Sequence, residues 1–223
     1  MAREHHNRLI NGIVDRTIRE LAPSASGRLL DIGCGAKPYE ADFAPYVDEY
    51  VGLEHAEATH GTEHADLIGS AYEIPAGDSS FDTVLSTAVL EHLEEPAAAL
   101  REARRVLRPG GLAIYIAPFI WHLHEEPRDF YRYSRYGLEH LFRGAGFDVA
   151  EIRPLSGFWV TFGQLFVYYL RRFDRGAGRP VVPAVSTAVQ RVSGFLDRVD
   201  RAEEWTWAYL VVARAARAAE PSP

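Results

Sequence analysis

The sequence predicts a doubly wound α/β fold, in which helices cover both faces of a seven-stranded, mostly parallel sheet. Short segments that are almost wholly apolar alternate with longer segments whose apolar residues recur at helical spacing. Strands of this apolar kind are buried on both faces, which is typical of parallel sheets. The chain has 223 residues, 47% of them hydrophobic, and this is enough for one such domain.

The first two thirds of the chain contain six of these strands. Strands are predicted at 28–32, 50–54, 65–68 and 81–86. Helices are predicted over residues 3–21, from Pro38 onward, and over 96–107. Pro109-Gly-Gly111 is expected to end that helix and to start a strand at 112–117. A polar and aromatic loop (118–133), a helix from Ser134 to Gly144 and a strand at 147–152 follow.

The last third breaks the alternation. Residues 158–170 are almost all apolar or aromatic, and apolar residues recur at helical spacing over 185–199. We therefore expect a helical hairpin inserted before a final strand at 206–213. The predicted organisation is one domain, 1–223, made of an N-terminal helix (1–25), a core (26–154), the hairpin (155–204) and the final strand (205–214).

Composition excludes several classes of protein. The net charge of −7 argues against a nucleic-acid partner, because phosphate binding needs a basic face. A single cysteine, Cys34, excludes a disulfide framework and a cysteine-based zinc site. The N-terminal segment is polar and amphipathic rather than a signal core, and no apolar run reaches the ~20 residues of a membrane span. We expect a cytoplasmic protein.

The segment Leu29-Leu-Asp-Ile-Gly-Cys-Gly35 carries the strongest chemical signal. A strand that leads through Gly-x-Gly into a helix lets the backbone approach a ligand closely, and Asp31 can accept hydrogen bonds from an ammonium group or water. Pro38 stands where a dinucleotide fingerprint needs a third glycine, which argues against NAD or FAD. Glu54, at the end of the second strand, is placed to bind ribose hydroxyls of an adenosine-containing cofactor.

Together with Phe81-Asp82, Leu90-Glu-His92 and Val106-Leu-Arg-Pro-Gly-Gly111, this segment resembles the class I S-adenosylmethionine-dependent methyltransferases over about residues 28–152. The resemblance implies strand order 3-2-1-4-5-7-6 with the last strand antiparallel, and S-adenosyl-L-methionine as cofactor. Ser70 stands where the family often has Asp, which leaves the adenine contact open among Asp66, Ser70 and the backbone, and Lys37 replaces a frequent third glycine. The implied cofactor-binding residues are Asp31, Gly33, Cys34, Gly35, Glu54, Ser70, Ala71 and Thr87.

The loop after the fifth strand holds the substrate candidates, because ligands of this fold bind at the carboxyl ends of the strands. His124 is the preferred general base, since an imidazole titrates near neutral pH. His92 and Tyr131 are further catalytic candidates, and His122, Arg132 and Tyr133 are candidates for binding the acceptor. A structural role stays open for each group. Asp129, Arg132 and the tyrosines would then form a hydrogen-bond network that holds the loop in place. His92 would then be a residue that only lies beside the cofactor.

Metal binding is not expected. Two groups could be read as metal clusters: His122 with His124, and His55, His60 and His64 with Glu57 and Glu63. Metal ligands need convergent geometry and outer hydrogen-bond partners, however, and acidic loops that contain histidine are common.

The predicted activity is methyl transfer to a small-molecule or glycan/lipid-linked acceptor in secondary-metabolite or cell-envelope biosynthesis, with the acceptor atom (O, N or C) undetermined. The alternatives are an NAD(P)-dependent oxidoreductase and a non-catalytic module that binds an adenosyl cofactor. Four roles are open for the hairpin. It packs on the sheet without further function, closes over the active site as a lid, forms the interface of a homodimer, or rests on an anionic lipid surface through the region of Arg171 and Arg172.

Overall fold

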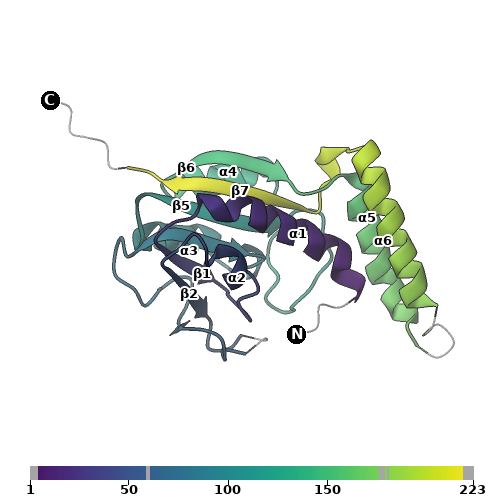
Figure 1. The fold of residues 1–223 in the computed structure, drawn as a ribbon, viewed down its shortest axis with the longest axis horizontal. Helices are drawn as coiled ribbons and strands as arrows, with labels where there is room; N and C mark the ends of the chain where they lie inside the picture. Colours follow the sequence, from purple (N-terminus) through teal and green to yellow (C-terminus); the bar gives the residue numbers. More distant parts are fainter. Residues whose placement is uncertain (1–4, 59–60, 176–178, 180, 218–223) are drawn as a thin grey trace.

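A computed structural model describes residues 5–58, 61–175, 179 and 181–217. Its centre is a seven-stranded sheet of order β3-β2-β1-β4-β5-β7-β6, in which β7 runs antiparallel to both of its neighbours (Figure 1). The predicted strand order is therefore confirmed. The strands are β1 (Arg28–Ile32), β2 (Glu49–Glu54), β3 (Leu67–Ile68), β4 (Phe81–Thr87), β5 (Leu107–Pro118), β6 (Phe147–Pro154) and β7 (Ala208–Ala215).

The helices lie in two layers around this sheet, with a hairpin at one end (Figure 1). Helix α2 is a single turn that begins two residues after Pro38, where the sequence predicted a helix to start. Residues 3–4 of the predicted N-terminal helix lie outside the described residues. The helices are α1 (Arg8–Leu21), α2 (Glu40–Phe43), α3 (Pro96–Val106), α4 (Arg135–Gly144), α5 (Phe158–Leu170) and α6 (Val182–Val199).

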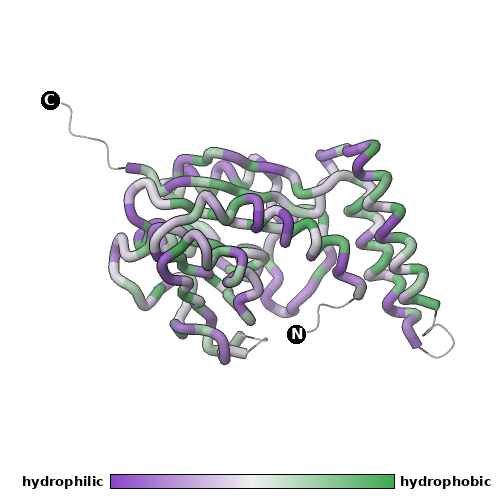
Figure 2. Tube along the Cα trace, viewed as in Figure 1, coloured by the Kyte–Doolittle hydropathy of each residue, from purple (hydrophilic) through white to green (hydrophobic). Residues whose placement is uncertain are grey.

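The central strands bury both of their faces, as their apolar sequences predicted. Successive residues of a strand point to opposite faces, so Leu30 and Val84 contribute to one core while Leu29 and Leu85 contribute to the other. The first core includes residues of α3 and α4, and the second includes residues of α1 and α2. In Figure 2 the strands are accordingly among the more hydrophobic parts of the trace.

Strand β5 begins five residues earlier than predicted. Leu107 pairs with Phe81, and the register shifts before Leu112 pairs with Thr83. Pro109-Gly-Gly111 thus lies within the strand as an irregularity instead of separating a helix from a strand, because pairing with β4 continues across it. Gly110, at φ +83°, supplies the left-handed backbone that this irregularity requires.

The hairpin of α5 and α6 is confirmed and is anchored at the start of α5. Asp197 on α6 accepts hydrogen bonds from the backbone amides of Gly157 and Val160 at 3.1 Å, which satisfies free donors at the N-terminus of α5. The outer sides of both helices keep large apolar side chains exposed, among them Phe166, Tyr169 and Phe195. Figure 2 shows hydrophobic and hydrophilic residues alternating along the hairpin. Among the described residues, no helix has both the length and the hydropathy to cross a membrane.

Candidate functional site

The glycine turn after β1 is held against β2 and the loop after β4. Gly33, at φ +73°, donates from its amide to Leu53 O at 2.9 Å. A Cβ on Gly33 would lie 2.4 Å from Val89 Cγ2, so only glycine permits this packing. Gly35 is also left-handed, at φ +50°, but a Cβ there would meet no atom within 4 Å. The turn is therefore packed on one side at Gly33 and open at Gly35.

Glu54 is connected directly to this turn. Its Oε2 accepts from the Gly35 amide at 2.9 Å, and its Oε1 accepts from the His55 amide at 3.0 Å. An ionised carboxylate has about four acceptor positions, so two remain for ligand hydroxyls. The open space at Gly35 and the free acceptor capacity of Glu54 fit the ribose of an adenosyl cofactor.

Asp31 lies beneath the same turn and is 2% exposed. Burial raises its pKa to about 7, although Tyr50 Oη donates to its Oδ2 at 2.6 Å and lowers the pKa. Burial also raises the pKa of the neighbouring Cys34 to about 12, which keeps that thiol protonated and unreactive. Cys34 can therefore line the cofactor turn only as a small apolar group.

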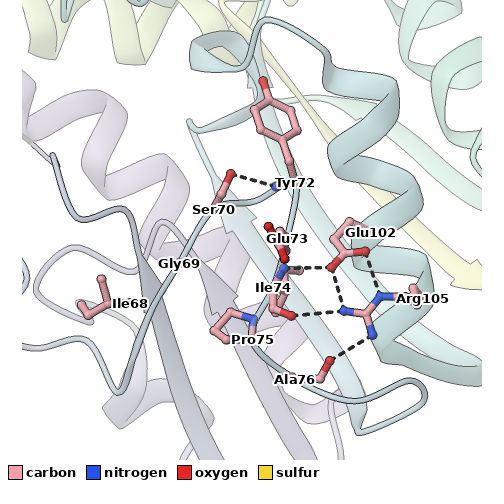
Figure 3. Close-up of a pocket in the computed structure, with 10 residues that line it drawn as sticks. All are labelled: Ile68, Gly69, Ser70, Tyr72, Glu73, Ile74, Pro75, Ala76, Glu102 and Arg105. Carbon is pink, nitrogen blue, oxygen red and sulfur yellow. Dashed lines mark hydrogen bonds and ion pairs between the residues drawn. The ribbon is translucent and has the colours of Figure 1, made fainter.

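The segment after β3, predicted to lie along the adenine, is fixed to α3. Figure 3 shows Glu102 and Arg105 on α3 beside the backbone of this segment. Glu102 Oε1 accepts from Ile74 N at 2.8 Å, and Arg105 donates to Ile74 O at 3.1 Å and to Ala76 O at 2.9 Å. The adjacent pocket of about 650 Å³ is lined by residues 68–70, 72–76, Glu102 and Arg105, and none of the glycine-turn residues lines it.

The polar groups near the adenine segment are already hydrogen-bonded. Ser70 Oγ accepts from Tyr72 N at 3.1 Å, and Asp66 accepts from Gly52 N at 2.7 Å and from Lys37 Nζ. Asp66 thus has a structural role in joining β2 to the turn. The contribution of Ser70, Ala71 and Thr87 to cofactor binding stays a prediction.

The loop after β5 is held in place by a partly buried ion pair. Arg132 donates to both carboxylate oxygens of Asp129, at 2.6 and 2.7 Å, and to the carbonyls of Trp121 and His122 at 3.2 and 2.6 Å. The Arg132 guanidinium holds the pKa of Asp129 far below its usual range. These contacts support the alternative in which Arg132 and Asp129 organise the loop, and they leave Arg132 little capacity to bind an acceptor.

The two tyrosines of this loop also donate to backbone groups. Tyr133 is 5% exposed, and its hydroxyl donates to Leu90 O at 2.8 Å. Tyr131 is exposed and donates to Glu94 O at 2.9 Å. Both bonds attach the loop to the segment after β4, so the structure favours a structural role for these tyrosines too. Their predicted catalytic and acceptor-binding roles stay untested.

Two histidines and a buried glutamate meet where the loops after β4 and β5 cross. Glu91 and His92 belong to the 3-10 helix Leu90–His92, and His124 comes from the loop after β5. His124 Nε2 lies 3.7 Å from Glu91 Oε1, and His92 Nε2 lies 3.9 Å from the same oxygen. Glu91 raises the pKa of His124, whereas burial lowers the pKa of His122. The sequence-predicted catalytic histidines are thus brought together.

The hairpin contacts the same loop through Tyr168 on α5. Its ring lies 4.1 Å from the His122 ring and 5.2 Å from the Trp121 ring, measured between centroids, and its hydroxyl donates to Asn7 Oδ1. His122 therefore sits between the hairpin and the histidine pair. This contact places the hairpin beside the predicted acceptor site.

Sequence reasoning did not single out three residues that organise this site. Glu91 was seen only as part of a motif, Tyr50 only as a strand residue, and Asp129 only as a member of a network. The usable signal for Glu91 was its position four residues after the end of β4 (Thr87), at the sheet edge that also receives His124. Of the histidines considered as metal ligands, His60 lies outside the described residues.

Comparison with known proteins finds similarity to methyltransferases. Residues 30–115 match the family described as "Methyltransferase domain". Over 108 residues the chain is 37% identical to a probable S-adenosylmethionine-dependent methyltransferase of Mycolicibacterium smegmatis, covering 45% of this chain and 42% of that one. Over 121 residues it is 34% identical to a ubiquinone biosynthesis O-methyltransferase of Ruegeria pomeroyi, covering 50% and 49%. The chain thus spans less than half the length of these relatives.

A solved structure extends the likeness in fold to nearly the whole chain. The methyltransferase in a complex with the Trm112 methyltransferase activator of Haloferax volcanii superposes with a TM-score of 0.63 at 21% identity. The superposition covers 97% of this chain and 96% of that one, so the hairpin-containing last third is included in the likeness of fold.

Proposed function

Because this chain belongs to the class I S-adenosylmethionine-dependent methyltransferases, we propose that it transfers a methyl group from that cofactor to a hydroxyl oxygen of a small-molecule or lipid-linked acceptor. The observation that carries the proposal is the meeting of two sites at one sheet edge. The glycine turn with Glu54 fits the cofactor, and Val89, which packs on Gly33, is two residues from Glu91 in the histidine cluster. The family match also argues against the nicotinamide-dependent alternative.

S-adenosylmethionine supplies an electrophilic methyl group on a positively charged sulfur. The acceptor oxygen donates an electron pair to the methyl carbon, the carbon–sulfur bond breaks, and its electron pair stays on sulfur. The protein mainly has to align the acceptor and exclude water, because alignment in a closed site supplies a large part of such rate accelerations. Asp31, Gly33, Gly35 and Glu54 would hold the cofactor for this step.

An acceptor hydroxyl must also lose its proton, and the histidine cluster is suited to take it up. His124 Nε2 faces a buried carboxylate at 3.7 Å, and its Nδ1 lies 3.4 Å from Asp129 Oδ2. This arrangement orients the imidazole and stabilises it when it is charged. The choice of oxygen as the acceptor atom rests on this cluster, and the name of the Ruegeria relative agrees with it.

The apolar hairpin favours an acceptor with a hydrophobic part. Tyr168 of α5 reaches His122, and the outer faces of the hairpin expose Phe166, Tyr169 and Phe195. An apolar chain attached to the acceptor could lie along this hairpin while the hydroxyl reaches His124. We therefore extend the proposal to hydroxylated aromatic acceptors with an aliphatic or prenyl chain.

Methyl transfer to a panel of acceptors tests the proposal. Purified protein would be incubated with methyl-labelled cofactor and with catechols, phenols, alkyl amines and thiols, each with and without an aliphatic chain. We expect label to move to hydroxylated aromatics, with formation of equimolar S-adenosylhomocysteine. Label transfer to the amines alone would overturn the choice of oxygen, and no transfer to any acceptor together with no cofactor binding would overturn the proposal.

A further inference from the structure

We propose that Glu91, His92 and His124 form a binding site for one divalent transition-metal ion, of the Zn²⁺, Co²⁺ or Mn²⁺ class. One potential ligand atom from each residue lies within 4.8 Å of the others. Two ligands about 2.1 Å from a shared ion are separated by roughly 3.0–3.6 Å. The observed separations of 3.7 and 3.9 Å from Glu91 Oε1 to the two Nε2 atoms need only a small contraction to reach this range.

One oxygen of the buried Glu91 carboxylate has no hydrogen bond to the described residues. Glu91 is 1% exposed, and within the described part of the chain its Oε2 has no hydrogen-bond partner. A buried carboxylate is costly unless hydrogen bonds or a positive charge compensate it. Arg132, the nearby cation of the same loop, is already committed to both oxygens of Asp129. A bound cation would compensate the carboxylate more strongly than the two imidazoles at its other oxygen do.

The outer nitrogen of each imidazole is held by neighbouring groups, so that both Nε2 atoms face the cluster. His92 Nδ1 lies 2.5 Å from Arg128 O, a carbonyl that can only accept, so this nitrogen carries the proton. His124 Nδ1 faces His122 O at 3.3 Å and Asp129 Oδ2 at 3.4 Å, with Arg132 Nη2 at 3.5 Å. Backbone carbonyls and carboxylates in these positions are the usual outer partners of metal-bound histidines.

This orientation points three potential ligand atoms at one position. Both Nε2 atoms face Glu91 Oε1, at 3.7 and 3.9 Å, which is longer than an ordinary hydrogen bond. Two imidazoles and one carboxylate are a common ligand set for zinc and for other transition metals that keep open coordination positions. Glu125 Oε2, 3.9 Å from His92 Nε2 at the exposed rim, is a further oxygen within reach.

The site would act on the acceptor hydroxyl, and this role, unlike the binding itself, rests on the proposed function. An acceptor oxygen in an open coordination position would have its pKa lowered by the ion and would face the cofactor turn as an oxyanion. Its proton would then leave to solvent, and His124 would act as a ligand where the ion is bound and as the proposed base only where it is absent. The inference replaces the sequence-based expectation that the chain binds no metal.

Spectroscopic titration of the chelator-treated protein with Co²⁺, and calorimetric titration with Zn²⁺, would test the site. We expect one ion per chain, visible d–d absorption of the cobalt form, and a Kd for zinc raised at least about a hundredfold by His92→Gln, His124→Gln or Glu91→Gln. His140→Gln, which removes an exposed imidazole on α4, is the matched control and should leave the zinc Kd unchanged.

Binding of S-adenosylhomocysteine separates failure of this site from failure of the proposed function. The three ligand variants should still bind S-adenosylhomocysteine, which also shows that they are folded. Absence of stoichiometric cobalt or zinc binding, or equal binding by the His92→Gln/His124→Gln double variant, would overturn the metal site. Zinc binding without methyl transfer to any acceptor would instead leave the site standing and count against the proposed function.

Discussion

Binding of an adenosyl ligand should strengthen as the pH rises through neutrality, because the ammonium group of the ligand favours the ionised form of Asp31. The pKa of Asp31 is raised to about 7, mainly by burial and in part by Glu54, against the lowering effect of Tyr50 and Lys37. The free protein therefore holds a proton on Asp31 under mildly acidic conditions. Binding must release that proton, so acid weakens binding.

The size of the effect follows from the ionised fraction of Asp31. One pH unit below the pKa about a tenth of the carboxyl groups are ionised, and one unit above it about nine tenths are. The Kd for S-adenosylhomocysteine should therefore fall about tenfold between about pH 6 and pH 8 and then level off. The raised pKa of Asp31 also affects stability. The free protein should become less stable as the pH rises from about 4 to about 7, because the folded state holds a proton that the unfolded chain releases.

Calorimetric titration with S-adenosylhomocysteine at several pH values would measure this dependence. Paired buffers of different ionisation enthalpy would also count the proton released, which should approach one at the acidic end. Asp31→Asn keeps the shape of the side chain but cannot ionise, so its Kd should be independent of pH. Tyr50→Phe removes the hydroxyl that donates at 2.6 Å, which should move the rise in affinity to a higher pH.

A pH-independent Kd in the wild-type protein would refute this reasoning. So would a tenfold change that persists in Asp31→Asn, since the responsible group would then lie elsewhere, for example in the histidine cluster.

Three further changes test the packing that positions the site. Gly33→Ala should lower the free energy of unfolding by roughly 1–3 kcal/mol, because φ is +73° and the new Cβ would lie 2.4 Å from Val89. An unchanged denaturant midpoint would contradict this. Phe142→Ala should cost about 3–5 kcal/mol by chemical denaturation, because this ring is wholly buried 5.1 Å from the Tyr115 ring; a loss under about 1 kcal/mol would show that the core collapses around the cavity. Ser134→Ala should lower stability by about 1 kcal/mol, because its hydroxyl accepts from Gly137 N at the start of α4, whereas Ser134→Asp should retain the cap and serve as the control.

The fold was predictable because its signals are local. Apolar strands such as residues 28–32 and helical spacing such as that over 185–199 depend only on neighbouring residues, and a helical hairpin leaves a recognisable break in the alternation. The early start of β5 was not predictable, since Pro109-Gly-Gly111 reads locally as a breaker. Pairing with β4 across the sheet decides the outcome there.

The arrangement of the candidate cofactor residues was more predictable than that of the candidate acceptor residues. Gly33, Gly35 and Glu54 meet because strand ends of a parallel sheet share one edge, which sequence order alone implies. Arg132 and Tyr133 donate hydrogen bonds to backbone carbonyls, and only the folded loop determines which carbonyls lie within reach. The burial of Glu91 likewise arises only when the loop after β5 closes over it.

The most direct test of the central claim is calorimetric titration with S-adenosylmethionine, S-adenosylhomocysteine and NAD. We predict micromolar binding of both adenosyl ligands, no binding of NAD, and at least about tenfold weaker adenosyl binding in Glu54→Ala, because a charged hydrogen-bond acceptor is lost. Glu57→Ala, which removes an exposed acid from the following loop, should bind like the wild type. Binding of NAD in place of the adenosyl ligands, or equal affinity in Glu54→Ala, would contradict the account.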